Sequence, residues 1–81
     1  MLTNIKYVIT ENDYIIVFPG LFNHSDFRHY NPKRAGFISF GVKDGNPTCS
    51  CYGESFSLGL KSDPKKDTLI AKRQLDMFDF Y

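Results

Sequence analysis

The stretch Ala35–Leu60, AGFISFGVKDGNPTCSCYGESFSLGL, decides the fold of this 81-residue chain. Its first part predicts a β-hairpin, because β-branched and aromatic residues alternate with small ones on both sides of a polar turn. The expected strands are Gly36–Val42 and Thr48–Tyr52, and Lys43–Pro47 connects them. Asp-Gly within that connection is a standard tight-turn dipeptide.

Alternation along the first strand of this hairpin predicts which of its faces is buried. Ile38, Phe40 and Val42 share one face, and we expect that face to enter the core. Pro47 cannot donate to a strand ladder, which predicts a connection slightly longer than a two-residue turn.

The second part of the stretch, Gly53–Leu60, alternates three apolar residues with small polar ones. A period of two predicts an extended segment, either a fifth strand or a strand that continues past a bulge at Gly53. Its apolar side chains would point inward. A compatible alternative is a rim of Glu54, Ser55 and Ser57 that faces a ligand.

The rest of the chain supplies a second hairpin and two helices. Ile5–Thr10 and Tyr14–Phe18 read as strands, and the second is apolar throughout, which is typical of a central strand covered on both faces. Asn23 and Asp26 have the spacing of a capping box, which predicts a short helix that Pro32 ends.

A last helix begins near Pro64, with Asp63 or Ser62 as its cap. Its apolar surface comes from residues that include Leu75 and Phe78. The sequence therefore predicts a single α+β domain over residues 1–81, in the order ββαββα, with a small antiparallel sheet of two hairpins, a short helix between them and a C-terminal helix.

The formal net charge of +1 excludes a partner chosen by global electrostatics. No long apolar run follows a basic N-terminus, and no stretch reaches the length of a membrane span, so we expect a cytoplasmic protein with no membrane partner. Cys49 and Cys51 point to one face of a strand, which is a poor geometry for a disulfide. They also make a weak metal signal, so we expect two reduced, partly buried thiols and no metal.

No motif in the chain predicts catalysis. His24, Ser25 and Asp26 are the residue types of a catalytic triad, but three adjacent side chains at a helix start diverge. The segment after Tyr52 lacks the Gly-Lys-Ser/Thr ending of a phosphate loop and the Gly-x-Ser-x-Gly of a nucleophile elbow. We therefore expect no enzyme activity, no catalytic residues and no cofactor.

A binding site is the remaining expectation. Its candidate residues are four that can carry positive charge, one aromatic for stacking and three polar ones: His24, Arg28, Lys33, Arg34, Tyr52, Glu54, Ser55 and Ser57. Short connections should bring the helix that starts near His24 close to the strand exit at Tyr52. Glu54 could then pair with Arg28, Lys33 or Arg34.

Several spaced blocks give the chain a resemblance to a group of short proteins from tailed phages and prophages. The blocks are Phe18-Pro19, His24-Ser25-Asp26, Ala35-Gly36-Phe37, Tyr52-Gly53-Glu54-Ser55, Ser57-Leu58-Gly59-Leu60, Ser62 and Asp67. The resemblance implies a phage accessory protein in the host cytoplasm, one that binds and inhibits or redirects a host factor such as a defence component.

Two alternatives stay open. A homo-oligomer could hold a small anionic ligand, such as a nucleotide signal, between its subunits. Nucleic-acid binding is the third option, and the near-zero net charge argues against it.

Overall fold

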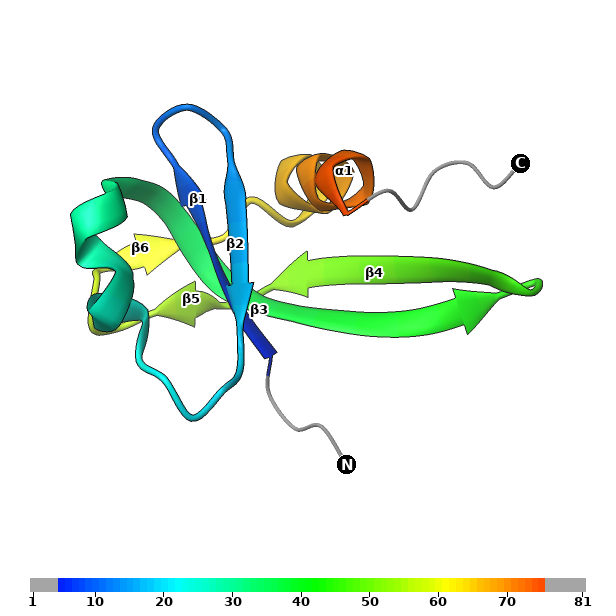
Figure 1. Ribbon diagram of the computed structural model, residues 1–81, viewed down its shortest axis with the longest axis horizontal. Coiled ribbons are helices and arrows are strands. Elements are labelled where there is room, and N and C mark those ends of the chain that lie inside the picture. Colours follow the sequence, from blue (N-terminus) through cyan, green and yellow to red (C-terminus); the bar gives the residue numbers. More distant parts are fainter. Residues whose placement is uncertain (1–4, 76–81) are drawn as a thin grey trace.

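Four strands form the main antiparallel sheet in the computed structural model, which describes residues 5–75 (Figure 1). The strands are β1 (Ile5–Thr10), β2 (Ile15–Phe18), β3 (Pro32–Lys43) and β4 (Asn46–Tyr52), in the spatial order β2-β1-β3-β4. A second, two-stranded sheet consists of β5 (Glu54–Ser55) and β6 (Leu60–Lys61). The α+β class is therefore confirmed, and the small sheet is an addition to the predicted order.

Two helices complete the described part of the chain. The element η1 (His24–Tyr30) lies between β2 and β3 and is a 3-10 helix, and α1 (Pro64–Gln74) follows β6. The side chain of Asp63 accepts a hydrogen bond from the Lys66 amide at 3.2 Å, which confirms Asp63 as the cap of α1. Phe78, predicted to add apolar surface to this helix, lies outside the described residues.

The central strand is β1, and the prediction that Tyr14–Phe18 is central was wrong. β1 pairs with both β2 and β3, whereas β2 is an edge strand. The apolar run in β2 has another cause, because both of its faces are packed. Ile15 and Val17 pack on one side of the sheet and Ile16 and Phe18 on the other.

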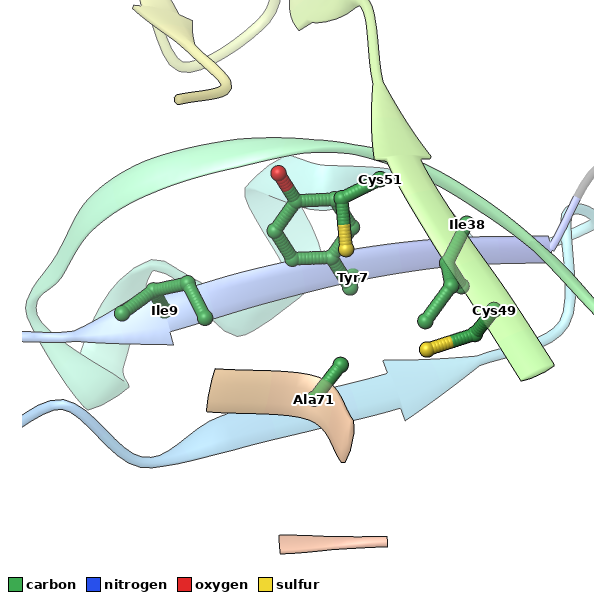
Figure 2. Packing of buried hydrophobic residues seen from close by; sticks show 6 residues of the cluster. All are labelled: Tyr7, Ile9, Ile38, Cys49, Cys51 and Ala71. Atoms are coloured by element: carbon green, nitrogen blue, oxygen red, sulfur yellow. The ribbon is translucent and has the colours of Figure 1, made fainter. Parts of the chain in front are cut away.

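The sheet separates two apolar clusters. On one face, α1 covers a cluster in which side chains from three strands converge on Ala71 of the helix (Figure 2): Tyr7, Ile9, Ile38, Cys49 and Cys51. On the other face, η1 and the β5–β6 sheet contribute Phe27, Leu58 and Leu60 around Val8, Phe18 and Ala35. The stretch Ala35–Leu60 thus supplies parts of both clusters.

The β3–β4 turn is shorter than predicted. Asp44 and Gly45 form a two-residue turn with φ angles of 54° and 80°, the pattern of a type I′ hairpin. Pro47 is therefore not part of the loop but stands in β4 opposite Val42. Because the backbone nitrogen of Pro47 points away from β3, its lack of an N–H removes no hydrogen bond between the two strands.

The outward direction at Pro47 follows from a hydrogen bond further along β4. The Cys51 amide donates to Thr68 Oγ1 of α1 at 2.9 Å, so the N–H of Cys51 points away from β3. Backbone N–H groups alternate in direction along a strand, so the backbone nitrogens of Cys49 and Pro47 also point away from β3. The other edge of the sheet is similar. On β2, the Ile15 amide donates to Gln74 Oε1 at 2.9 Å.

The outer half of the β3–β4 hairpin extends beyond the core (Figure 1). Ile38 is buried as predicted, but Phe40 is 42% and Val42 75% exposed. The prediction that all three enter the core was wrong for the last two, because the cluster under α1 ends at the level of Ile38 and Cys49. The alternation of apolar and polar residues therefore continues along β3 beyond the part of the strand that α1 covers.

The segment after Gly53 is a tight hairpin rather than an extended strand. The Gly59 amide donates to the Phe56 carbonyl at 3.2 Å, which closes a turn between β5 and β6. Leu58 and Leu60 pack inward as predicted, but the ring of Phe56 is 89% exposed. The period-two prediction failed because the turn reverses the chain at its third residue.

Candidate interaction surface

A row of four side chains crosses the main sheet on the face that η1 covers. In the strand register, Lys6 of β1 stands opposite Phe18 of β2 and Phe37 of β3, and Phe37 stands opposite Tyr52 of β4. The rings of Phe37 and Tyr52 are stacked, with centroids 5.8 Å apart. We call Phe18, Lys6, Phe37 and Tyr52 the aromatic row.

His24, the first residue of η1, lies over the aromatic row. Its ring meets Phe18 and Phe37 edge-on, with both centroid distances at 5.7 Å. Its Nε2–H donates to the Gly36 carbonyl, 2.8 Å away. Burial lowers the pKa of His24 below its ordinary value of 6.5, and the nearby Lys6 ammonium acts in the same direction. His24 is therefore a neutral side chain that anchors η1 to β3 through a hydrogen bond, rather than a positively charged residue available to bind an anion.

Two glycines let the backbone at Tyr52 and Gly53 lie close to β3. A Cβ on Gly36 would lie 2.4 Å from the Tyr52 carbonyl oxygen. Gly53 has a φ of +80°, and a Cβ there would lie 3.0 Å from the ring of Phe37. The sequence predicted a bend at Gly53, and the structure places that bend against the aromatic row.

Large apolar side chains are exposed on this side of the molecule. The exposed fractions are 81% for Leu21, 45% for Phe22, 46% for Tyr52 and 89% for Phe56. Lys6 Nζ donates to the Phe22 carbonyl at 2.9 Å and so holds the loop before η1 beside the aromatic row. We call Leu21, Phe22, Tyr52 and Phe56 the η1-side patch.

Arg28 joins η1 to the turn of the small sheet. Its guanidinium donates to the Ser57 carbonyl at 3.1 Å. Beside it lies a shallow cleft of about 290 Å³, lined by Glu11, Arg28, Asn31, Pro32, Leu58 and Leu60. The helix and the segment after Tyr52 therefore lie together, as the sequence predicted, and Arg28 and Ser57 are the candidate residues that meet there.

The predicted pairing of Glu54 with Arg28, Lys33 or Arg34 was wrong, because Arg28 donates to the Ser57 carbonyl and the other two cations pair with aspartates. Lys33 binds Asp13, with Nζ and Oδ1 2.7 Å apart, and lowers the pKa of that carboxyl through their hydrogen bond. Arg34 points to the α1 face, because Ala35 occupies the η1 face and neighbours in a strand alternate. Glu54 stands opposite Lys61 in the β5–β6 register instead.

Ser55, the last residue of β5, stabilises the following turn and is not part of a ligand-facing rim. It is buried, and its Oγ accepts from the Leu58 amide at 3.2 Å and lies 3.4 Å from Ser57 Oγ. Of the three residues proposed for that rim, Ser57 is exposed and Glu54 half-buried.

Sequence reasoning missed a buried polar group on the α1 face. Asp67 is fully buried and accepts hydrogen bonds from the Tyr7 hydroxyl at 2.6 Å and the Asp63 amide at 2.9 Å. Arg34 Nε donates to its other oxygen at 2.5 Å. Burial, and then the bond to Asp67, raise the pKa of Tyr7. The available signal was spacing, because Asp67 lies four residues before the buried Ala71 and so on the inner face of α1.

The two cysteines are free and buried, as predicted for reduced thiols. Burial raises the pKa of Cys49 and raises that of Cys51 to about 11, so both thiols stay protonated at neutral pH. Within residues 5–75, no three His, Cys, Asp or Glu side chains gather in a way that could hold a metal ion.

Searches against protein-family models, curated proteins and solved structures find no match to this chain. No helix among residues 5–75 has the length and apolar character needed to cross a membrane.

Proposed function

We propose that this chain is a non-enzymatic binding protein that recognises a protein partner through the η1-side patch. The observation that carries this proposal is the exposure of Leu21, Phe22, Tyr52 and Phe56 on one side of a small domain. Large apolar side chains exposed on one side of a domain are typical of protein–protein interfaces, in which aromatic residues are enriched.

The reactive side chains already have structural roles, which supports binding over catalysis. His24 is buried against two rings and donates to a backbone carbonyl. Asp67 has its oxygens occupied by Tyr7, Asp63 and Arg34. Cys49 and Cys51 are buried as thiols.

The partner that we propose is a host factor, and the chain would inhibit or redirect it as a phage accessory protein in the host cytoplasm, with a defence component as the target. This part rests on the resemblance of the spaced sequence blocks to small proteins of tailed phages. Binding without catalysis is consistent with it.

An apolar partner surface fits the charges better than a small anionic ligand does. Lys33 is paired with Asp13, Arg34 with Asp67, and His24 is neutral at pH 7. Arg28 is the remaining cation of the predicted set, and Glu11 lines the same cleft. Nucleic acid fits less well still, because the net charge of +1 gives little attraction to phosphates.

The test is capture of a host protein, followed by affinity measurements on the purified pair. Replacing Leu21 and Phe56 together by Gln removes two exposed anchors without touching the core, and we expect the Kd to rise by at least about tenfold. Leu69→Gln is the matched control, because Leu69 is 45% exposed on α1, across the sheet. It should leave the Kd unchanged.

Two results would overturn the proposal. In one, the native chain retains no host protein at physiological salt and its expression leaves host defence unaffected. In the other, the double variant binds the captured partner as tightly as the native chain and the Leu69→Gln control do.

A further inference from the structure

The outer β3–β4 hairpin, residues 39–50, is amphipathic beyond the point at which α1 covers it. We call it the arm. Phe40 and Val42 continue the apolar face that begins at the buried Ile38. The opposite face of the arm carries only small, polar or charged side chains, namely Ser39, Gly41, Lys43, Asn46, Thr48 and Ser50. A pattern that alternates this regularly indicates that the apolar face is normally covered.

An apolar groove lies at the base of the arm. It has a volume of about 240 Å³ and is lined by Ile5, Val17, Phe18, Pro19 and Phe40. None of its lining residues is charged, so its occupant must be apolar as well. Val42 lies on the same face, opposite Pro47 of β4, and is 75% exposed.

The arm and the groove together make the surface self-complementary. A two-fold interface needs one patch that presents both a protrusion and a recess, because each copy fills the other. Along β3, Val42 lies two residues beyond Phe40, and Ile38, which pairs with Ile5 of the groove, lies two residues before it. Both steps are about 7 Å.

We propose that two copies of this chain pair arm to groove, with the two-fold axis passing close to Phe40. The two β3 strands run antiparallel and cross near Phe40, so that Val42 of each copy contacts Ile5 and Val17 of its partner's groove. The two Phe40 rings meet at the axis.

Face-to-face packing fits the arm better than edge-to-edge pairing of β4 strands. Pro47 has no N–H to donate at the outward edge of β4, and the Cys51 amide is already bound to Thr68. The net charge of +1 opposes self-association only weakly. The groove and the arm offer six described apolar side chains (Ile5, Val17, Phe18, Pro19, Phe40 and Val42), whereas a standard interface has roughly 20–30 residues a side, so we expect a dimer that dissociates on dilution through the micromolar range.

Sedimentation equilibrium of the 81-residue chain over a concentration series tests the proposal. We expect the mass to rise from monomer to dimer. Val42→Asp should remain a monomer throughout, because it places a charge in the partner's groove. Ser39→Asp, on the opposite face of the same strand, should dimerise like the native chain.

Cysteine cross-linking tests the axis directly and does not depend on the stability of Val42→Asp. Phe40→Cys should form an intermolecular disulfide under mild oxidation, because the two copies meet there. Ser39→Cys should not, and the native chain, whose two thiols are buried, should not either.

A native chain that stays monomeric at all concentrations overturns the proposal. So does dimerisation that survives Val42→Asp, or equal cross-linking of Phe40→Cys and Ser39→Cys. The dimer variants change Phe40 or Val42 of the arm, whereas the partner-binding variant changes Leu21 and Phe56, so loss of dimerisation and loss of partner binding are separate outcomes.

Discussion

At the scale of single residues, Gly36 fixes how closely β4 can follow β3. The Tyr52 carbonyl occupies the place where a Cβ of residue 36 would be, at 2.4 Å. Tyr52 is the last residue of β4, and the chain continues from it through Gly53 into the small sheet. The absence of a side chain at Gly36 therefore allows the Tyr52 carbonyl to lie this close to β3.

Replacing Gly36 by Ala should therefore destabilise the protein by roughly 1–3 kcal/mol, since a backbone carbonyl must move to make room. Urea unfolding followed by circular dichroism measures the change. Gly41→Ala is the matched control, because its Cβ would meet only Thr48 Cγ2, at 3.9 Å. An equal loss in both variants would show that contact with Tyr52 is not the cause.

The sequence could not reveal this role of Gly36. A glycine next to Phe37 in a strand pattern is compatible with a bulge, a bend or a close approach, and only the partner strand decides among them. The role of Gly53 was easier to predict, because a glycine between a strand and a polar segment already indicates a bend.

At the scale of elements, η1 is held to the sheet by contacts of its first residue. A seven-residue 3-10 helix has little stability of its own. His24 supplies a hydrogen bond to Gly36 and two ring contacts, and Phe27 stacks on Phe18 with centroids 4.0 Å apart. The helix persists because its side chains dock.

The docking of His24 predicts a pH dependence. Its pKa is lowered in the folded state, so the unfolded chain binds the proton first as the pH falls. Stability should be level above pH 7 and fall as the pH drops below 6.5, the ordinary value for this group. Urea midpoints measured from pH 7.5 to 5 check this, because carboxylates titrate mainly below that range.

Variants at the two histidines separate this effect from others. His24→Gln should have a lower midpoint that no longer varies with pH in this window. His29→Gln, at an exposed position of the same helix, should keep the slope of the native protein. A native midpoint that is flat from pH 7.5 to 5 would contradict the assignment.

Most elements could be predicted, because they depend on local pattern. The two hairpins, the start of η1 and the Asp63 cap all follow from turn dipeptides, capping residues and alternation. The position of β2 at the edge and the exposure of Phe40 could not be predicted, because they depend on what covers each face. The Glu54 pairing failed for a related reason, since Arg34 faces α1 rather than η1.

At the scale of the whole molecule, Asp67 ties together segments that are far apart in the chain. Its carboxylate accepts from Tyr7 in β1, 60 residues away, and from Arg34 in β3, 33 residues away. The bond to the Asp63 amide adds the start of α1. This one side chain therefore links the first strand, the long middle strand and the last helix.

Asp67→Asn should destabilise the whole domain by about 3 kcal/mol, because Arg34 loses its buried counter-charge. Unfolding should remain a single transition, with the loss seen equally by circular dichroism and by tyrosine fluorescence. Asp13→Asn removes an exposed carboxylate that pairs with Lys33 and lies 3.7 Å from the Arg34 guanidinium, and it should change the midpoint far less. Similar losses in both variants would argue against a special role for the buried carboxylate.

The two edges of the main sheet also bear on how the protein ages in concentrated solution. On β4, Cys49 is the one outward amide between Pro47 and the occupied Cys51, and on β2, Val17 holds the same place between the occupied Ile15 and Pro19. A cross-β fibril grows by adding strands through uninterrupted runs of free amides, which neither edge offers. Long storage should therefore yield small discrete species that do not stain with thioflavin, while Pro47→Val, which restores one amide beside Cys49, should shorten the lag before fibrils form.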